Sequence, residues 1–351
     1  MQGFEYIDVA GTPIEMGRQL GSQMATKIHA LAEERMRLWL ARDENIARER
    51  ALSIGRDCLE IQASWNRDVH EEFIGISEGA DIDPSLLYIA NGFTDLRDIQ
   101  GSSKGIYGCT SFALEPTVTL DKQPLCGQTW DMHNSAEDFL IIIRRRPKKG
   151  LNTLALTTAG CLTLTGMNSA GLAMGNNNVV PDHAQPGVMY LAILHSAISQ
   201  DNLEDACRVI TDAPRASGHH YYLTDADGSV IGIETTALRS DELKATDGIY
   251  VHANHYISPT LKGFSRNKPG VSSLSRQGRL TSILKSAFGS IDIAFLQKAL
   301  SDRENEPHCI CRHGENEAAK TCAAIIMAPS QRQIWVVAGP PDMGSWHNIL
   351  L

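Results

Sequence analysis

Apolar residues recur at helical spacing through most of the first hundred residues. A helix start is indicated by Thr12, Pro13 and Glu15, because threonine can cap, proline suits the first turn and glutamate can close a capping box. A further short helix is expected after residues 83–84, an Asp-Pro pair. The predicted helices cover residues 18–59, 70–80 and 85–91. The first third of the chain is therefore predicted to be mostly helical.

Beyond residue 108 the pattern changes to short apolar or alternating runs, which are typical of strands. The predicted strands cover residues 110–114, 124–130, 139–145, 153–158, 162–167, 171–180, 221–224, 230–234, 249–254, 322–327 and 333–338. Helical patterns separate these blocks at residues 188–199, 203–211, 275–287 and 292–302. Hairpin-connected strands between paired helices indicate antiparallel sheets and not a parallel βαβ sheet. We therefore predict an α+β fold with two stacked antiparallel sheets between helix layers.

Composition and charge narrow the class of protein. The 351 residues suit one large domain or two, and 42% hydrophobic and 21% charged residues are ordinary globular values. No apolar run approaches the roughly 20 residues of a membrane span, and residues 1–10 lack the pattern of a secretory signal. The net charge is −9 and basic residues gather only at 144–149, which argues against nucleic acid. We expect a cytoplasmic protein that binds neither membrane nor nucleic acid.

No cofactor and no metal are expected. The sequence has no phosphate loop and no G-x-G-x-x-G motif. His308, Cys309, Cys311 and His313 alternate as C-x-C-x-H, without the gap of about two to four residues found in zinc knuckles. The eight cysteines are spread over an acidic chain without paired spacing, which fits reduced thiols better than a disulfide framework.

The most informative position is the junction of Gly108 and Cys109, where the helical pattern gives way to strands behind an apparent linker at 101–108. The thiol of a cysteine that opens a strand can attack the preceding carbonyl, which a glycine leaves unhindered. Cutting there would give a free α-amine with a pKa of ~7.7 to 8.0, close to the ~8.5 of a free thiol, so no catalytic histidine is needed. The alternative is that Cys109 is simply a small buried residue at a strand start.

Several segments resemble one family of enzymes. The segment Gly108-Cys109-Thr110-Ser111, followed by residues 127–131 (Gly-Gln-Thr-Trp-Asp), resembles the acyl-coenzyme A:6-aminopenicillanic acid acyltransferase family of self-cleaving N-terminal nucleophile hydrolases, of peptidase C45 type. Similarity to choloylglycine hydrolases and penicillin V acylases is more distant. Further similar segments are residues 15–21, 76–80, 158–160 and 166–172. The resemblance implies the four-layer αββα sandwich of these hydrolases, with Cys109 as the nucleophile.

The resemblance also implies roles for residues outside the junction. Asp131 matches the aspartate that orients the new amino terminus and assists self-cleavage. Asn254 matches the asparagine whose amide donates to the tetrahedral oxyanion. Arg312 matches a late arginine that pairs with the catalytic aspartate or with a substrate carboxylate.

Other positions carry a looser resemblance. Asn177, in a run of three asparagines, stands where the bile-salt and penicillin V enzymes place a second asparagine near the oxyanion. Thr110 is a further candidate for substrate or oxyanion binding. Residues 218–221 depart from the serine-histidine-asparagine of many members, so the substrate pocket is expected to differ. Glu234 matches an acidic position that is expected to be structural.

These residues predict a cysteine N-terminal nucleophile enzyme that acts through an acyl-enzyme on the amide bond of a small N-acyl or peptide-like metabolite. We expect cutting into residues 1–108, a helical fragment that stays tightly bound, and residues 109–351, the catalytic fragment. Water as acceptor would make the enzyme an amidohydrolase, and a bound amine would make it an acyltransferase. An intact papain-like cysteine hydrolase and an unprocessed ligand-binding homologue are the alternatives. A homo-oligomer is compatible with each of them.

Overall fold

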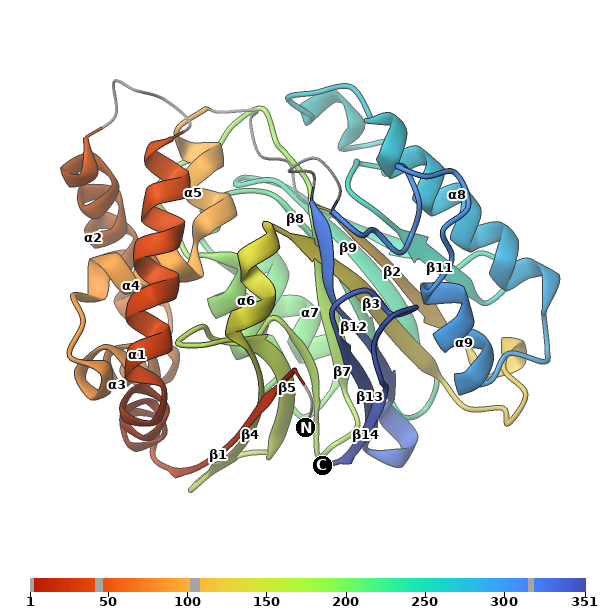
Figure 1. The fold of residues 1–351 in the computed structure, drawn as a ribbon, viewed down its shortest axis with the longest axis horizontal. Helices are drawn as coiled ribbons and strands as arrows, with labels where there is room; N and C mark the ends of the chain where they lie inside the picture. Colours follow the sequence, from red (N-terminus) through yellow and green to blue (C-terminus); the bar gives the residue numbers. More distant parts are fainter. Residues whose placement is uncertain (1–2, 42–46, 102–107, 315–318) are drawn as a thin grey trace.

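Two β-sheets lie face to face at the centre of the molecule, and helices cover their outer sides (Figure 1). The structure is a computed structural model that describes residues 3–41, 47–101, 108–314 and 319–351. The larger sheet has the strand order β1-β4-β5-β6-β7-β8-β9-β10. Its strands are β1 (Glu5–Gly11), β4 (Leu140–Pro147), β5 (Thr153–Thr158), β6 (Thr165–Asn168), β7 (Ala173–Asn178), β8 (His219–Thr224), β9 (Val230–Thr235) and β10 (Ser240–Lys244).

The smaller sheet has the strand order β11-β2-β3-β12-β13-β14. Its strands are β2 (Cys109–Leu114), β3 (Leu125–Met132), β11 (Ile249–His252), β12 (Lys320–Ala328), β13 (Gln333–Ala338) and β14 (His347–Leu350). The strands β2 and β3 face β7 of the larger sheet, so the two sheets are in direct contact. Every neighbouring pair in this sheet is antiparallel, as its hairpin connections predict.

Helices form the two outer layers. On the smaller sheet lie α8 (Val271–Ser286) and α9 (Ile293–Leu300), and Leu280 and Leu284 of α8 share an apolar cluster with Phe112 of β2. The other layer consists of α1 (Pro13–Leu40), α2 (Arg48–Trp65), α3 (Arg67–Ala80), α4 (Pro84–Asn91), α5 (Phe93–Ile99), α6 (Tyr190–Ala197) and α7 (Leu203–Asp212). The predicted αββα sandwich is therefore confirmed.

The helices α1 and α3 touch backbone to backbone. A Cβ atom at Gly17 would lie 2.1 Å from the carbonyl oxygen of Glu72, and one at Gly79 would lie 2.3 Å from that of Arg18. Any side chain at these two positions would force the helices apart. Both glycines fall in the N-terminal segments that resemble the family, so this part of the resemblance has a packing reason.

The structure also differs from the sequence prediction. The elements β1, β10, β14 and α5 were not predicted, and β1 pairs with β4 in parallel, an exception to the antiparallel pattern. The strand β10 pairs with β9 at the edge of the sheet and has no buried residue, so no apolar alternation marks it. The helix predicted over 18–59 is two helices, α1 and α2. Residues 102–107 of the predicted linker lie outside the described residues.

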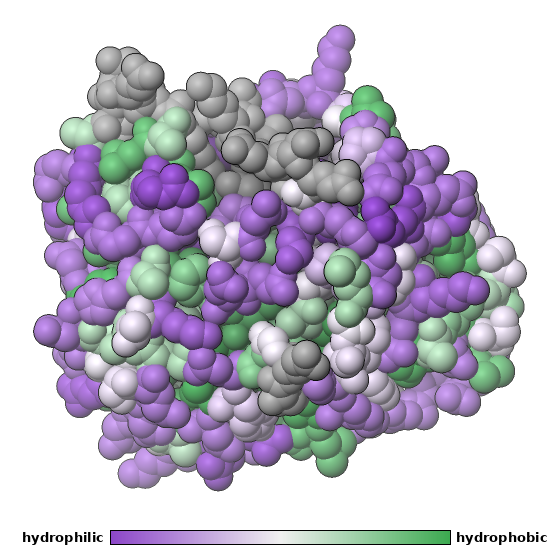
Figure 2. Space-filling model, viewed as in Figure 1, coloured by the Kyte–Doolittle hydropathy of each residue, from purple (hydrophilic) through white to green (hydrophobic). Residues whose placement is uncertain are grey.

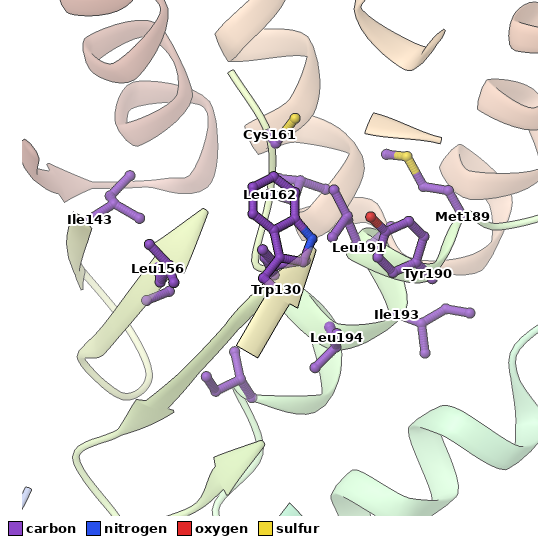
Figure 3. Packing of buried hydrophobic residues seen from close by; sticks show 14 of the residues in the cluster. Trp130, Ile143, Leu156, Cys161, Leu162, Met189, Tyr190, Leu191, Ile193 and Leu194 are labelled. Atoms are coloured by element: carbon purple, nitrogen blue, oxygen red, sulfur yellow. The ribbon is translucent and has the colours of Figure 1, made fainter. Parts of the chain in front are cut away.

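One apolar core joins the chain on both sides of the Gly108–Cys109 junction. Leu20 of α1 and Phe73 of α3 belong to the same buried cluster as Ile141 of β4. Figure 3 shows another part of this cluster, which includes Trp130 of β3, Leu162 and Leu191. The described residues before Cys109 are thus part of the same folded body as the strands that follow them.

The face of the molecule shown in Figure 2 gives little indication of partners. The face shown in Figure 2 is mostly hydrophilic, with apolar residues in small separate areas. Within the described residues, no helix combines the length and the apolar character that crossing a membrane requires.

Candidate active site

Cys109 is the first residue of β2, which lies inside the smaller sheet between β11 and β3. Its side chain is buried, and it pairs with Trp130 on β3, so that Asp131 is the next residue along that strand. The N–H group of Asp131 donates to the carbonyl oxygen of Gly108 at 2.7 Å. A backbone donor therefore holds the carbonyl of the peptide bond that the sequence predicts to be cut.

Asn254 and Arg276 fix the backbone of Cys109. The Cys109 N–H donates to Oδ1 of Asn254 at 2.9 Å, and Nη2 of Arg276 donates to the same oxygen at 2.8 Å. Nη1 of Arg276 donates to the Cys109 carbonyl oxygen at 2.6 Å and to Oγ1 of Thr110 at 2.8 Å. The Asn254 Nδ2 group donates to the carbonyl oxygen of Asn178 at 2.9 Å. In this state the oxygen of the Asn254 amide, and not its NH2 group, faces Cys109.

The carboxyl group of Asp131 is buried beside two arginines. Its Oδ1 accepts a hydrogen bond from the Thr321 hydroxyl at 2.8 Å, and its Oδ2 lies 3.8 Å from Nη1 of Arg312. Oδ2 is buried and has no hydrogen-bond partner among the described residues. Burial raises the pKa of Asp131 above its usual value, against the effect of Arg276, Arg312 and Thr321. One oxygen of this carboxyl group is thus available to a new partner.

The thiol of Cys109 is protonated at neutral pH in the uncut chain. Burial raises its pKa to about 12, and the negative charge of Asp131 acts in the same direction. The backbone N–H of Asp131 and the charge of Arg276 oppose this shift without overcoming it. A thiolate at neutral pH therefore requires a base close to the sulfur.

The remaining predicted residues lie at different distances from Cys109. Thr110 belongs to the site, because Arg276 binds its hydroxyl group. Asn177 reaches the site only through Ser111, whose hydroxyl group donates to Oδ1 of Asn177 at 2.6 Å. Asn178, the next residue on β7, is the one whose backbone meets Asn254. The structure therefore brings together Cys109, Thr110, Asp131, Asn254 and Arg312, with Asn177 one contact away.

An open cleft of about 400 Å³ adjoins this group of residues. Gly108, Asn254 and Arg312 are among the residues that line it. Lys268 and Arg276 also line it, and no Asp or Glu belongs to its described lining. The cleft is thus large enough for a small metabolite and carries positive charge next to the predicted nucleophile.

Comparison with known proteins decides the family. Residues 118–343 match the model of the family described as acyl-coenzyme A:6-aminopenicillanic acid acyl-transferase. The chain belongs to this family. It is 25% identical over 311 residues to the 40 kDa form of the acyl-coenzyme A:6-aminopenicillanic-acid-acyltransferase of Emericella nidulans, a match that covers 88% of this chain and 84% of that protein.

One solved structure supports the same fold. A variant of the conjugated bile acid hydrolase of Clostridium perfringens matches with a TM-score of 0.50 and 16% identity, over 69% of this chain and 92% of that one. The penicillin V acylase of Agrobacterium tumefaciens matches with a TM-score of 0.47 and 14% identity, over 69% of this chain and 86% of that one. At such identities the likeness concerns the fold alone. The predicted resemblance, the fold class and the expectation of an N-terminal nucleophile enzyme are confirmed at the level of the family.

The sequence analysis of this acyl-transferase family member missed Arg276, which contacts both Cys109 and Asn254. It lies on α8, and its side chain is 2% exposed. Arg276, Leu280 and Leu284 are all buried at a spacing of four residues, which places the arginine on the inner face of the helix. That position on an otherwise apolar face was the signal in the sequence.

A chain of buried rings lies behind the site. Nε2 of His252 lies 2.7 Å from Oε1 of Glu234, and the ring of His220 stacks on that of His252 at 3.6 Å. Burial and the neighbouring His252 lower the pKa of His220 well below its usual value. Oε1 and Oε2 of Glu234 also accept the backbone N–H groups of Ile257 and Ser258. This network fixes the segment that carries Asn254, so Glu234 has structural contacts here.

The cysteines are all in the described part of the chain, and each of the eight is a free thiol. Two residues of the C-x-C-x-H segment, Cys311 and His313, meet Asp342, with one candidate ligand atom of each within 4.8 Å of the others. They are hydrogen-bonded to one another: the Cys311 thiol donates to Oδ1 of Asp342 at 3.0 Å, and Nε2 of His313 lies 2.9 Å from the same oxygen. Cys309 is turned away and donates to the Cys311 carbonyl oxygen at 2.9 Å.

Proposed function

We propose that the chain cuts itself between Gly108 and Cys109 and then uses Cys109 to hydrolyse the amide bond of a small N-acyl or peptide-like metabolite. The observation that carries this proposal is the hydrogen bond from the Asp131 N–H to the Gly108 carbonyl, which belongs to the peptide bond that joins Gly108 to Cys109. A donor at that oxygen stabilises the negative charge that develops when a nucleophile attacks the carbonyl carbon.

The cutting step needs only groups of this chain and water. The Cys109 sulfur attacks the Gly108 carbonyl carbon, and the bond to the Cys109 nitrogen breaks as that nitrogen takes up the thiol proton. The resulting thioester is then hydrolysed, which gives a Gly108 carboxylate, a free thiol and a free α-amine. The absence of a side chain at Gly108 supports this step, because a Cβ there would lie 3.0 Å from Oδ2 of Asp131 and 3.1 Å from Nη2 of Arg276.

In the cut enzyme the new α-amine acts as the base for the thiol beside it. Oδ1 of Asn254 accepts a hydrogen bond from the Cys109 N–H in the uncut chain. It is therefore placed to accept a hydrogen bond from the new α-amine and hold that amine in position. Our sequence-based assignment of Asn254 as oxyanion donor stays a prediction; its NH2 group donates to the Asn178 carbonyl in the uncut chain. Asp131 and Arg312 would complete the site, since Oδ2 of the aspartate is unpartnered among the described residues and faces the arginine.

The lining of the cleft supports a substrate that carries a negative charge. Lys268, Arg276 and Arg312 line it, and a carboxylate on the substrate is the partner that an arginine fork binds best. We propose hydrolysis and treat acyl transfer to a bound amine as the competing outcome. The division into a fragment 1–108 and a fragment 109–351 stays a prediction, and so does the cytoplasmic location of the protein.

The test combines fragment masses with activity for the wild type, Cys109→Ala and Cys109→Ser. We expect the wild type to yield two polypeptides, the second starting at Cys109, and to release the amine from N-acylated amino acids. Cys109→Ala should neither cut nor turn over, and Cys109→Ser should do both at a rate lowered by at least about 100-fold, because a hydroxyl is a much weaker nucleophile.

The alternatives give different results in the same experiment. A single intact mass together with full turnover would favour an enzyme that works uncut, as a papain-like hydrolase does. A single intact mass without turnover, but with ligand binding, would favour an unprocessed binding protein. A product that contains an added amine, formed in place of the free acid, would make the protein an acyltransferase.

A further inference from the structure

A second polar cavity, of about 270 Å³, lies between the helices α1, α3 and α6 and the strands β4 and β5. None of the residues that line it also lines the cleft beside Cys109. Its polar lining includes Asn66, Asp68, Arg145, Lys149, Thr153 and Ser196. We call it the Arg145 cavity.

Arg145 places a buried pair of charged donors in the wall of this cavity. The side chain is only 2% exposed, and its Nε donates to Oε1 of Glu72 at 2.6 Å. Its two terminal nitrogens, Nη1 and Nη2, are buried without a hydrogen-bond partner among the described residues. Buried charged donors are costly when unpaired, and a guanidinium presents such a pair to two oxygens of one anion.

Other groups around the cavity are also suited to bind an anion. The Thr153 hydroxyl is buried and has no hydrogen-bond partner among the described residues. Asn66 is the N-cap of α3, so the positive end of a 14-residue helix lies at the cavity wall. Lys149 adds an exposed ammonium group at the rim.

The balance of charge indicates what kind of anion fits. Burial raises the pKa of Glu72, but Arg145 and His195 outweigh this effect and hold that pKa at about 2, so Glu72 is ionised. The two cations Arg145 and Lys149 thus face the two carboxylates Glu72 and Asp68, and the ring of His195, with Nε2 3.2 Å from Oε2 of Glu72, completes this group. A site whose cations are nearly matched by carboxylates accepts a monoanion more readily than a dianion.

We propose that the Arg145 cavity is a binding site for a small carboxylate, held by the two terminal nitrogens of Arg145. The ligand would touch α1 and α3 on one side and β4, β5 and α6 on the other. If the chain is cut after Gly108, it would therefore contact both fragments. The proposal does not depend on that cut, and binding is best measured on uncut Cys109→Ala protein.

The experiment measures the thermal unfolding of full-length Cys109→Ala protein in sodium acetate, phosphate and chloride at equal ionic strength. Acetate should raise the unfolding temperature in a saturable way that chloride does not reproduce. Adding Arg145→Met should weaken the apparent acetate affinity by about ten-fold or more. Arg144→Met is the matched control, because Arg144 is the neighbour on the same strand, does not line the cavity and should leave the affinity unchanged.

Arg145→Met also removes the partner of Glu72, so two milder variants complete the test. Thr153→Val keeps the side-chain volume, and Lys149→Met changes only the rim; each should weaken acetate binding by about two- to five-fold while the protein stays folded in chloride. Equal acetate affinity in both variants, or no saturable effect of acetate at all, would overturn the proposal. A larger effect of phosphate than of acetate, lost in Thr153→Val, would overturn the assignment to a carboxylate.

Discussion

Arg276 is the side chain that connects the separate parts of the active site. It reaches the carbonyl oxygen of Cys109 and the hydroxyl of Thr110, both on β2, and the amide oxygen of Asn254 in the loop after β11. Burial lowers its pKa, the nearby Asp131 acts in the opposite direction, and Arg312 lowers the pKa further. Its loss should leave the Asn254 amide free to turn.

We expect Arg276→Met to slow self-cutting by about 10- to 100-fold, the effect of losing hydrogen bonds from one charged group. The rate is measured from the masses of cut and uncut chain over time. Arg279→Met is the control: Arg279 lies one turn further along α8 and pairs with Asp302 at 2.6 Å, outside the site. Equal rates for the two variants would show that Arg276 does not position Asn254 for cutting.

The sequence revealed those site residues that stand in recognisable segments. Cys109 and Asp131 lie on neighbouring strands of one hairpin. The two motif segments that contain them are therefore paired directly in the sheet. Asn254 and Arg312 were found through resemblance alone. Arg276 lies 167 positions from Cys109, and no local pattern reveals a contact over that separation. The choice between Asn177 and Asn178 depended on strand register, which adjacent identical residues leave undetermined.

At the scale of elements, the contact of α1 with α3 depends on the absence of side chains. We expect Gly17→Ala to destabilise the protein by about 1–3 kcal/mol, because the new Cβ would lie 2.1 Å from a backbone oxygen that cannot rotate away. Gly278→Ala is the control, because the same substitution is made there at a helical glycine without close neighbours. It lies exposed inside α8 with nothing within 4 Å of the added Cβ, so it should stabilise by up to about 1 kcal/mol.

Unfolding in denaturant measures both glycine variants. If Gly17→Ala were as stable as the wild type, the helices could separate without cost, and the close packing would not be what holds them. Helix and strand positions were largely predictable, because each buried face repeats at a regular period. The edge strand β10 and the parallel partner of β4 were not, since they depend on backbone pairing and on distant parts of the chain.

At the scale of the whole molecule, cutting should not release the first 108 residues. The strand β1 is bonded to β4 along its length, the helices α1 and α3 share the core of the larger sheet, and Glu72 forms its buried ion pair with Arg145 across the junction. We expect the two fragments to elute together, at the volume of uncut Cys109→Ala, in gel filtration without denaturant. Separation under those conditions would mean that the fragments are not held by the shared core.

The hydrogen bond between Asp131 and Gly108 has a consequence beyond the cut itself. If the chain is cut after Gly108 and that carbonyl departs, the N–H of Asp131 loses its acceptor. A substrate carbonyl that takes its place would meet the same donor. One backbone amide can in this way serve the maturation of the enzyme once and each turnover thereafter. A main-chain group is present whatever the side chain, so Asp131→Asn would change the charge of the site and keep that donor.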